Sequence, residues 1–175
     1  LLDTVKSRCA FVAQGRTGFF EIKEFLVQRG YNARSAEIAA FLSGGSVNSA
    51  VELIGGNIAE GLFYAVLDTL KNMTGTRVSL SYVSELAKYR DNYKLLLTAF
   101  EAFFAEIIRF YQGSPYLSQT EEIAAVANNY SPEAAARSIE LVEGAYTKLN
   151  SRVNFNMAFD NLILKILEVR YRCPK

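Results

Sequence analysis

The sequence of 175 residues contains no histidine and no tryptophan, and only two cysteines and three prolines. Without histidine the chain cannot build a Ser-His-Asp or Cys-His catalytic site, or a metal site with histidine ligands. Two cysteines are too few for a zinc site of the usual kind. Because nothing else in the sequence indicates export, we expect Cys9 and Cys173 to be reduced thiols rather than a disulfide.

Long apolar runs and an excess of charge are also missing. No apolar run reaches the ~20 residues of a membrane span, and no signal peptide is visible. We therefore expect no membrane partner and a cytoplasmic protein. The net charge of +1 gives no overall field for binding nucleic acid or acidic lipid. The chain begins with leucine, and we expect it to be part of a longer protein.

The residues that are abundant predict a helical fold. Half of the chain is hydrophobic and 21% is charged, which is typical of a globular protein. Alanine, leucine, glutamate and lysine fill long segments, and no clear series of alternating strands is present. The exception is Thr4–Gln14, which is β-branched and apolar and fits either a short strand or an extended segment. We predict an all-α protein.

Three short helices are expected in the first part of the chain, separated by glycines. Thr17 is the expected N-cap of a helix that reaches Arg29, and Gly30 ends it. A second helix is predicted from Ala33 to Ser43, and Gly44-Gly45 stops it. Ser46 is the expected N-cap of the third, which ends at Gly55-Gly56. These helices are expected to form a small bundle of their own.

Longer helices are expected in the rest of the chain. A helix capped by Asn57 runs to Met73, and the polar turn at 74–76 is the candidate domain boundary. Helical spacing then continues over 81–112, with an interruption at 90–92. Two further N-termini are predicted, a capping box formed by Ser118 and Glu121 and an N-cap at Ser131 followed by proline. The helix after Ser131 is expected to end near residue 150.

The last helix, predicted over Asn154–Tyr171, carries two apolar strips nearly opposite each other, so we expect it to be buried on two sides. A central helix of one bundle and a helix that also meets a second surface both fit this pattern. The first strip contains Phe155, Phe159, Leu162, Ile163, Ile166 and Val169. The second strip, the candidate surface for a partner, contains Met157, Leu164, Leu167 and Tyr171.

Few constellations of polar residues indicate chemistry. Gly44-Gly45-Ser46 before a helix can bind an anion through free N–H groups, but it lacks the lysine and glycine spacing of a phosphate-binding loop, so a plain turn is favoured. The glutamates at 101 and 106, and at 121 and 122, are interpreted as solvated helix faces. The basic residues at 170, 172 and 175 are interpreted as an ordinary basic helix end.

Three segments together resemble bacterial clamp-loader subunits of the delta-prime type in DNA polymerase III. Thr4–Cys9 is similar to the T-x-x-S-R-C segment at the end of the clamp-loader AAA+ core. Glu37–Val51 is similar to the lid stretch of these proteins, with its Gly-Ser and a following alanine. Val153–Lys165 resembles the V-N-x-x-L-A-x-[ED]-N-x-L-L-K ending. The resemblance covers essentially the whole chain.

The resemblance implies an architecture and residue roles. Residues 1–15 would end the AAA+ core, 16–76 would form its three-helix lid, and 77–175 would form the helical collar that holds the pentamer. In the motif Ser7, Arg8 and Cys9, Arg8 would be an arginine finger that reaches the ATP of a neighbouring subunit, where a fixed guanidinium stabilises the transferred phosphoryl group. Asn48 stands where ATP-hydrolysing subunits carry a sensor arginine.

The function that follows from the resemblance is loading of the sliding clamp onto primed DNA during replication. The chain itself would have no catalytic site and no cofactor, with ATP bound on neighbouring subunits of a complex that has loader ATPase and DNA polymerase activity. Its expected partners are the delta and gamma or tau subunits and, through the whole complex, the clamp and DNA. The alternatives are the gamma or tau motor subunit itself and an unrelated helical ligand-binding or regulatory domain.

Overall fold

The structure, a computed structural model, describes residues 15–173 and is entirely helical over that range, which confirms the predicted all-α class. The expected extended segment 4–14 lies outside the described residues. The helices are α2 (Phe19–Gln28), α3 (Ala33–Leu42), α4 (Val47–Gly55), α5 (Ala59–Asn72), α6 (Thr76–Leu86), the 3-10 helix η1 (Ala87–Asn92), α7 (Tyr93–Tyr111), α8 (Thr120–Ala127), α9 (Pro132–Asn150) and α10 (Phe155–Arg172).

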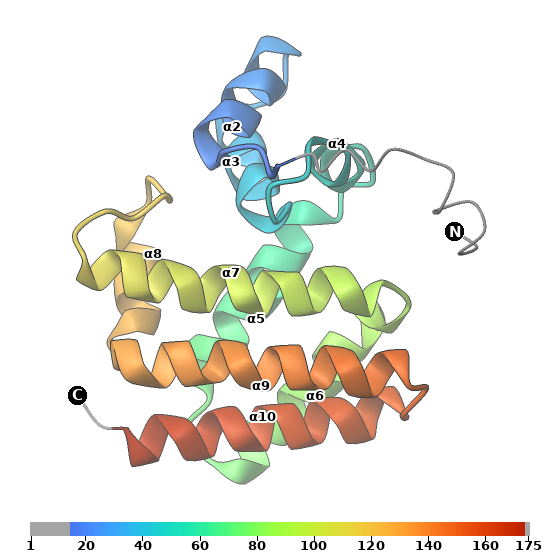
Figure 1. Ribbon diagram of the computed structural model, residues 1–175, viewed down its shortest axis with the longest axis vertical. Helices are drawn as coiled ribbons and strands as arrows, with labels where there is room; N and C mark the ends of the chain where they lie inside the picture. The colour runs from blue at the N-terminus through green and yellow to red at the C-terminus, as the bar shows by residue number, and fades with distance from the viewer. Residues whose placement is uncertain (1–14, 174–175) are drawn as a thin grey trace, which may run out of the picture.

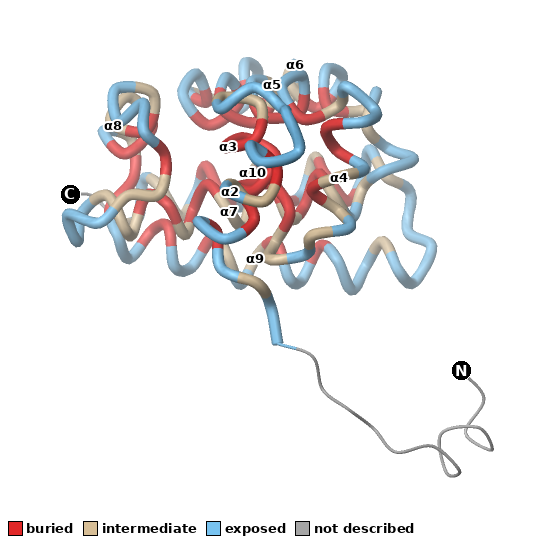
Figure 2. Tube along the Cα trace, turned by 90° about the horizontal axis from the view of Figure 1, so that it is seen from above, coloured by how far each residue is buried: buried red, intermediate tan, exposed pale blue. Residues whose placement is uncertain are grey.

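The long helices form two layers. Figure 1 shows α7, α9 and α10 side by side, with neighbours running in opposite directions, and α5 and α6 behind them. The short helices α2, α3 and α4 lie together beyond α7, at one end of the molecule. Seen from above in Figure 2, buried residues fill the space between the α5–α6 side and the α7–α9 side. The core therefore lies between the layers and continues into the short helices.

Most helix ends follow their sequence signals. The Ser46 hydroxyl accepts a hydrogen bond from the backbone N–H of Ser49, at 3.3 Å. The Ser131 hydroxyl accepts one from Ala134, at 3.1 Å, with proline at the next position. Gly30 adopts the left-handed conformation expected after a helix. The predicted interruption at 90–92 falls within the 3-10 helix η1.

Three predicted N-caps are wrong. Thr17 is not a cap, because α2 begins after Gly18, whose N–H donates to the Glu21 carboxylate. Asn57 has a positive φ of 52° and lies in the turn, so Ile58 precedes α5. Ser118 lies outside α8, which begins after Gln119, so the predicted capping box does not form. The hydroxyl of Ser118 has another partner, described below.

The helix predicted to begin at Ser81 begins five residues earlier, at Thr76. Gly75, the residue before it, has an extended backbone and accepts the first hydrogen bond of α6 from Ser79. The predicted domain boundary at 74–76 thus falls in a very short link between α5 and α6. Side chains on both sides of this link, from Phe19 to Leu167, belong to one hydrophobic cluster.

Aromatic side chains connect the short helices to α7. Phe41 of α3, Phe63 of α5 and Phe103 of α7 meet with their ring centroids 5.0–5.9 Å apart, in edge and tilted arrangements that favour aromatic pairs. All three side chains are buried. Because they come from both sides of the α5–α6 link, α7 packs against the early helices as well as against α9.

Helix α10 is buried on one side and only partly covered on the other. The first strip is buried at its centre, at Phe159, Leu162, Ile163 and Ile166, against α9 and α6. On the second strip Leu167 is buried and Leu164 is half-buried, whereas Met157 and Tyr171 are 69% and 61% exposed. The described residues thus cover the second strip only in part and leave its two ends accessible.

Within residues 15–173 no one helix has both the length and the apolar character needed to cross a bilayer. Helices α4 and α5 pass that test only as a pair, bent by 97° at the break between them.

Candidate functional site at the turn between α3 and α4

The turn at Gly44 and Gly45 is the centre of the candidate site. Both glycines have positive φ angles, 60° and 85°, which other residues rarely adopt. The turn is held from the α3 side by Ser43, whose hydroxyl donates to the carbonyl of Ala40 at 2.8 Å and accepts from the N–H of Gly45 at 3.3 Å. The sequence after the turn begins α4 with its N-cap at Ser46. The local chain direction is therefore fixed on both sides.

The segment 15–17, which precedes α2, passes directly over this turn. The N–H of Thr17 donates to the carbonyl of Gly45 at 3.0 Å. A Cβ atom on Gly45 would lie only 2.8 Å from the Cβ of Arg16, closer than real side chains approach. Glycine is thus required at position 45 both by its φ angle and by the neighbouring segment.

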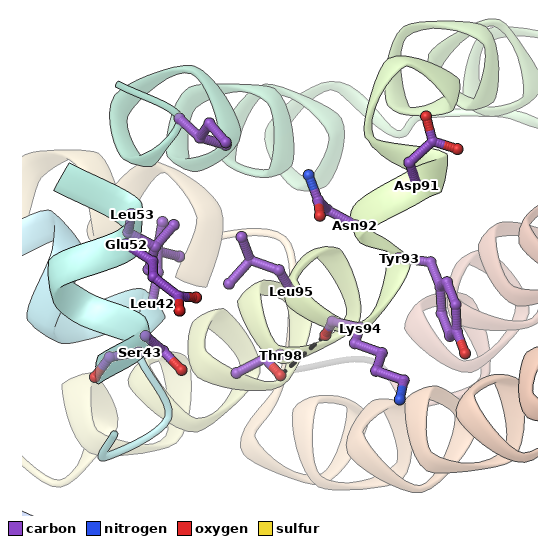
Figure 3. Close-up of a pocket in the computed structure, with 12 residues that line it drawn as sticks. Leu42, Ser43, Glu52, Leu53, Asp91, Asn92, Tyr93, Lys94, Leu95 and Thr98 are labelled. Atoms are coloured by element: carbon purple, nitrogen blue, oxygen red, sulfur yellow. Dashed lines mark hydrogen bonds between the residues drawn. The ribbon is translucent and has the colours of Figure 1, made fainter. Parts of the chain in front are cut away.

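Three surface hollows adjoin the turn and α7, with volumes of about 400, 350 and 560 Å³. Thr98 of α7 lines all three. In the first, Figure 3 shows Leu42 and Leu53 facing Leu95 across the space between α3, α4 and α7, with Thr98 below them. The third contains Asn48. The hollows give the turn an accessible surface on both of its sides.

The charged residues that line these hollows are Arg16, Glu52, Asp91, Lys94, Glu101 and Arg109. Burial is the main cause that raises the pKa of Glu101, the carboxylate of Glu143 raises it further, and Arg16 opposes both. Asn48 is exposed and neutral at the position where the resemblance places a sensor arginine. Among the described residues this arrangement offers hydrogen bonds, carboxylates and the cations of Arg16, Lys94 and Arg109 to a ligand. It contains no nucleophile paired with a base.

The predicted site residues are not brought together in one place. Ser7, Arg8 and Cys9 lie outside the described residues, although the chain continuing from them reaches the α3–α4 turn. Met157, Leu164, Leu167 and Tyr171 follow one another along α10, a helix that does not contribute to the three hollows. The turn and the α10 strip are therefore two separate surfaces.

A buried carboxylate that the sequence analysis did not single out lies on α3, seven residues before Gly44. Glu37 of α3 is 1% exposed and accepts hydrogen bonds from Lys23 at 2.6 Å, from Arg34 at 3.0 Å, and from the N–H and hydroxyl of Ser118 at 3.3 and 2.8 Å. Burial alone raises the pKa of a carboxyl, but these hydrogen bonds outweigh it and lower the pKa of Glu37. Arg34 also pairs with Glu122 of α8.

Glu106 of α7 is a second buried carboxylate, and the interpretation of this residue as part of a solvated face is wrong. One of its oxygens accepts from the N–H groups of Tyr116 and Leu117, at 2.6 and 2.9 Å, and the other accepts from Arg109 at 3.2 Å. The Tyr116 ring lies between Arg109, 4.0 Å from its centroid, and Phe19 of α2, stacked at 4.8 Å. Glu106 therefore holds the loop that follows α7.

The sequence does indicate that these two glutamates are unusual, because both are charged residues at positions that helical periodicity assigns to the core. Glu37 falls inside a run of buried α3 positions, and Glu106 lies between apolar positions of the aromatic face of α7. A carboxylate is rarely buried without partners. A charged residue at a position that periodicity assigns to the core thus predicts a buried polar network, but the distant partner Ser118 cannot be read from it.

No group of three or more histidine, cysteine, aspartate or glutamate side chains in the described part of the chain is placed to hold a metal ion. Comparison of the chain with protein-family models, with curated protein sequences and with solved structures gave no match. No family, relative or structural neighbour therefore identifies the chain as a clamp-loader subunit.

Replacing Gly45 by alanine should destabilise the protein, because the new Cβ meets the Arg16 side chain and the positive φ is unfavourable for alanine. We expect a loss of about 2 kcal/mol in the free energy of unfolding, measured by urea denaturation. The matched control is Gly55→Ala, where the new methyl group meets open space at the end of α4 and should be neutral or stabilising. Equal effects of the two substitutions would contradict the close approach at the turn.

Replacing Glu37 by glutamine should lower stability in a way that depends on pH. The pKa of Glu37 is lower in the folded than in the unfolded state, so its ionised form adds stability above the unfolded pKa of ~4.3, and this is lost as the pH falls through the folded value. At pH 7 we expect Glu37→Gln to cost about 2 kcal/mol, with the difference from wild type shrinking below pH 4. The exposed control Glu133→Gln should change stability by less than about 0.5 kcal/mol. A deficit for Glu37→Gln that is constant with pH would argue against an ionised Glu37.

Proposed function

We propose that this chain is the C-terminal part of a delta-prime-type subunit of a bacterial clamp loader. It would act in the cytoplasm, as a structural and regulatory component of the complex that loads the sliding clamp onto primed DNA. Its partners would be the delta and gamma or tau subunits. The chain would contribute no catalytic site and bind no cofactor of its own.

The observation that carries the proposal is a contact between the second resembling segment and the chain that follows the first one. The chain that continues from the T-x-x-S-R-C segment at Thr4–Cys9 binds through Thr17 to Gly45, inside the segment Glu37–Val51 that resembles the lid. The chain that follows the first segment is thus bound to the second segment. This backbone contact supports the proposal that the end of the AAA+ core and the lid form one region that faces the nucleotide.

The third resembling segment begins α10. The Asn154 side chain accepts from the N–H of Met157 at 3.3 Å and caps this helix, so the V-N start of the motif has a clear local role. Met157, inside the motif, is an exposed apolar side chain. An exposed methionine followed along the helix by the half-buried Leu164 is suited to an apolar contact with another collar.

The neutral Asn48 favours the delta-prime type over the gamma or tau motor subunit. A sensor residue must provide a cation to the phosphates of bound ATP, and an amide cannot replace a guanidinium there. Asn48 lies on the exposed face of α4, beside the hollow of about 560 Å³ that Arg16 also lines. The proposal accordingly assigns ATP hydrolysis to neighbouring subunits, with Arg8 acting on their nucleotide.

Assembly tests the proposal directly. The chain mixed with the delta and gamma or tau subunits should co-elute with them in size-exclusion chromatography. Leu164→Glu should abolish co-elution while the circular dichroism spectrum stays helical, because a buried charge is costly at an interface. Lys165→Glu, on the polar side of the same helix, is the matched control and should assemble. Well-folded partners that never co-elute with the wild-type chain would exclude the proposal.

The role of Arg8 is tested in the full-length subunit within the reconstituted loader. Arg8→Ala should leave assembly intact and slow DNA-stimulated ATP hydrolysis by about 10³-fold at the site it serves, as expected for the loss of an arginine finger. Lys6→Ala, in the same segment, should hydrolyse ATP at the wild-type rate. Unchanged hydrolysis with Arg8→Ala would remove this role.

A further inference from the structure

The C-terminal end of α5 is completed by side chains from distant parts of the chain. The last carbonyl groups of a helix have no partner within the helix, and many helices satisfy them with a glycine in the left-handed conformation. Helix α5 ends instead at Asn72, followed by Met73 with φ −68° and ψ 85°, and no glycine follows until residue 75. The carbonyl groups at this end must therefore find donors elsewhere.

Four donors reach carbonyl groups of the last turn of α5 and of the link that follows it, two from the turn between α8 and α9 and two from the end of α10. We call these four residues the latch: Asn129, Tyr130, Arg170 and Tyr171. The bonds are Tyr130 Oη to Leu70 O at 3.4 Å, Asn129 Nδ2 to Lys71 O at 2.8 Å, Arg170 Nη1 to Met73 O, and Tyr171 Oη to Thr74 O at 2.6 Å.

Arg170 is the centre of the latch. Its second terminal nitrogen, Nη2, donates to Asn129 Oδ1 at 3.0 Å, while the amide nitrogen of Asn129 donates to α5. The guanidinium also lies 5.5 Å from the ring centroid of Tyr130 and 5.8 Å from that of Tyr171. A planar guanidinium can serve two acceptors and two rings at once, which a lysine cannot. The interpretation of Arg170 as an ordinary basic helix end is thus wrong.

The latch lies at the α5–α6 link and includes partly exposed side chains, so it differs from the packing of the apolar core. Two of its hydrogen bonds go to the link between α5 and α6, which joins helices α2–α5 to helices α6–α10. Figure 1 shows the C-terminal end of α10 below the N-terminal end of α9, so three chain segments meet there. Arg170 is half-buried and Tyr171 is 61% exposed, so these two side chains can leave without opening the apolar core.

We propose that the latch is a conformational device that couples the C-terminal surface of α10 to the α5–α6 link. When it is closed, as in the structure, both segments and the α8–α9 turn are held together. When Arg170 and Tyr171 are drawn away, the link and the last turn of α10 open locally while the two-layer core remains closed. Any partner that engages the exposed ring of Tyr171 acts on this equilibrium. The inference uses only these contacts and does not rest on the clamp-loader proposal.

Hydrogen–deuterium exchange of the purified chain at neutral pH tests the device. Arg170→Met keeps the apolar stem and removes the donors. We expect backbone amides of 73–79 and 170–173 to exchange at least about tenfold faster, because bonds from a charged donor are lost, while amides of α7 keep their wild-type rates. The matched control is Arg172→Met, because Arg172 pairs with Glu168 on the same exposed face, and this variant should leave all three regions unchanged.

Tyr171→Phe provides a second variant that removes one hydroxyl and is expected to fold. It should accelerate exchange in the same two regions, by a smaller factor than Arg170→Met. Faster exchange confined to α10 in either variant would show that the two segments are not coupled and would overturn the proposal. An equal acceleration in α7, which reports global unfolding, would also overturn it, as would an Arg172→Met variant that behaves like Arg170→Met.

Discussion

Three consecutive backbone N–H groups in the loop after α7 depend on two buried carboxylates. Those of Tyr116 and Leu117 donate to Glu106, and that of Ser118 donates to Glu37. Backbone groups withdrawn from water need acceptors, and a buried carboxylate needs several donors, so each satisfies the other. Because Glu106 belongs to α7 and Glu37 to α3, the loop fixes the position of α3 on α7. Moving α3 by one turn along α7 would separate Glu37 from the N–H and hydroxyl of Ser118.

This constraint explains how the short helices remain attached to the long ones. The polar contacts lie at one edge of the interface, where Arg34 also reaches Glu122 of α8. The aromatic contacts among Phe41, Phe63 and Phe103 lie inside it. The aromatic area supplies most of the favourable free energy, and the carboxylates select one arrangement, since apolar contacts alone tolerate sliding. The α3–α4 turn is held in place over α7 as a result.

The fold class and most helix ends could be predicted from the sequence because their causes are local. Ser131 caps α9 through an atom three residues away, and the helical spacing of apolar side chains marks the buried face of α10. Two of the errors have distant causes. Ser118 matches a capping pattern, yet its hydroxyl bonds to Glu37, 81 residues away. Arg170 matches a helix-end pattern, yet it donates to the carbonyl of Met73. Where a polar side chain has both a local and a distant partner available, a local pattern cannot choose between them.

The two halves of α10 differ in the contacts that their second-strip residues make. The second strip was expected to be one continuous surface for a partner, but Leu167 is buried and the hydroxyl of Tyr171 is engaged with Thr74. Met157 and Leu164 are the members of the strip that retain accessible apolar surface without such a bond. Under the clamp-loader proposal, a neighbouring collar would therefore contact the N-terminal half of α10 first. The C-terminal half is already occupied by the latch, and a neighbour that reached it would have to displace Tyr171, which would connect assembly to the α5–α6 link.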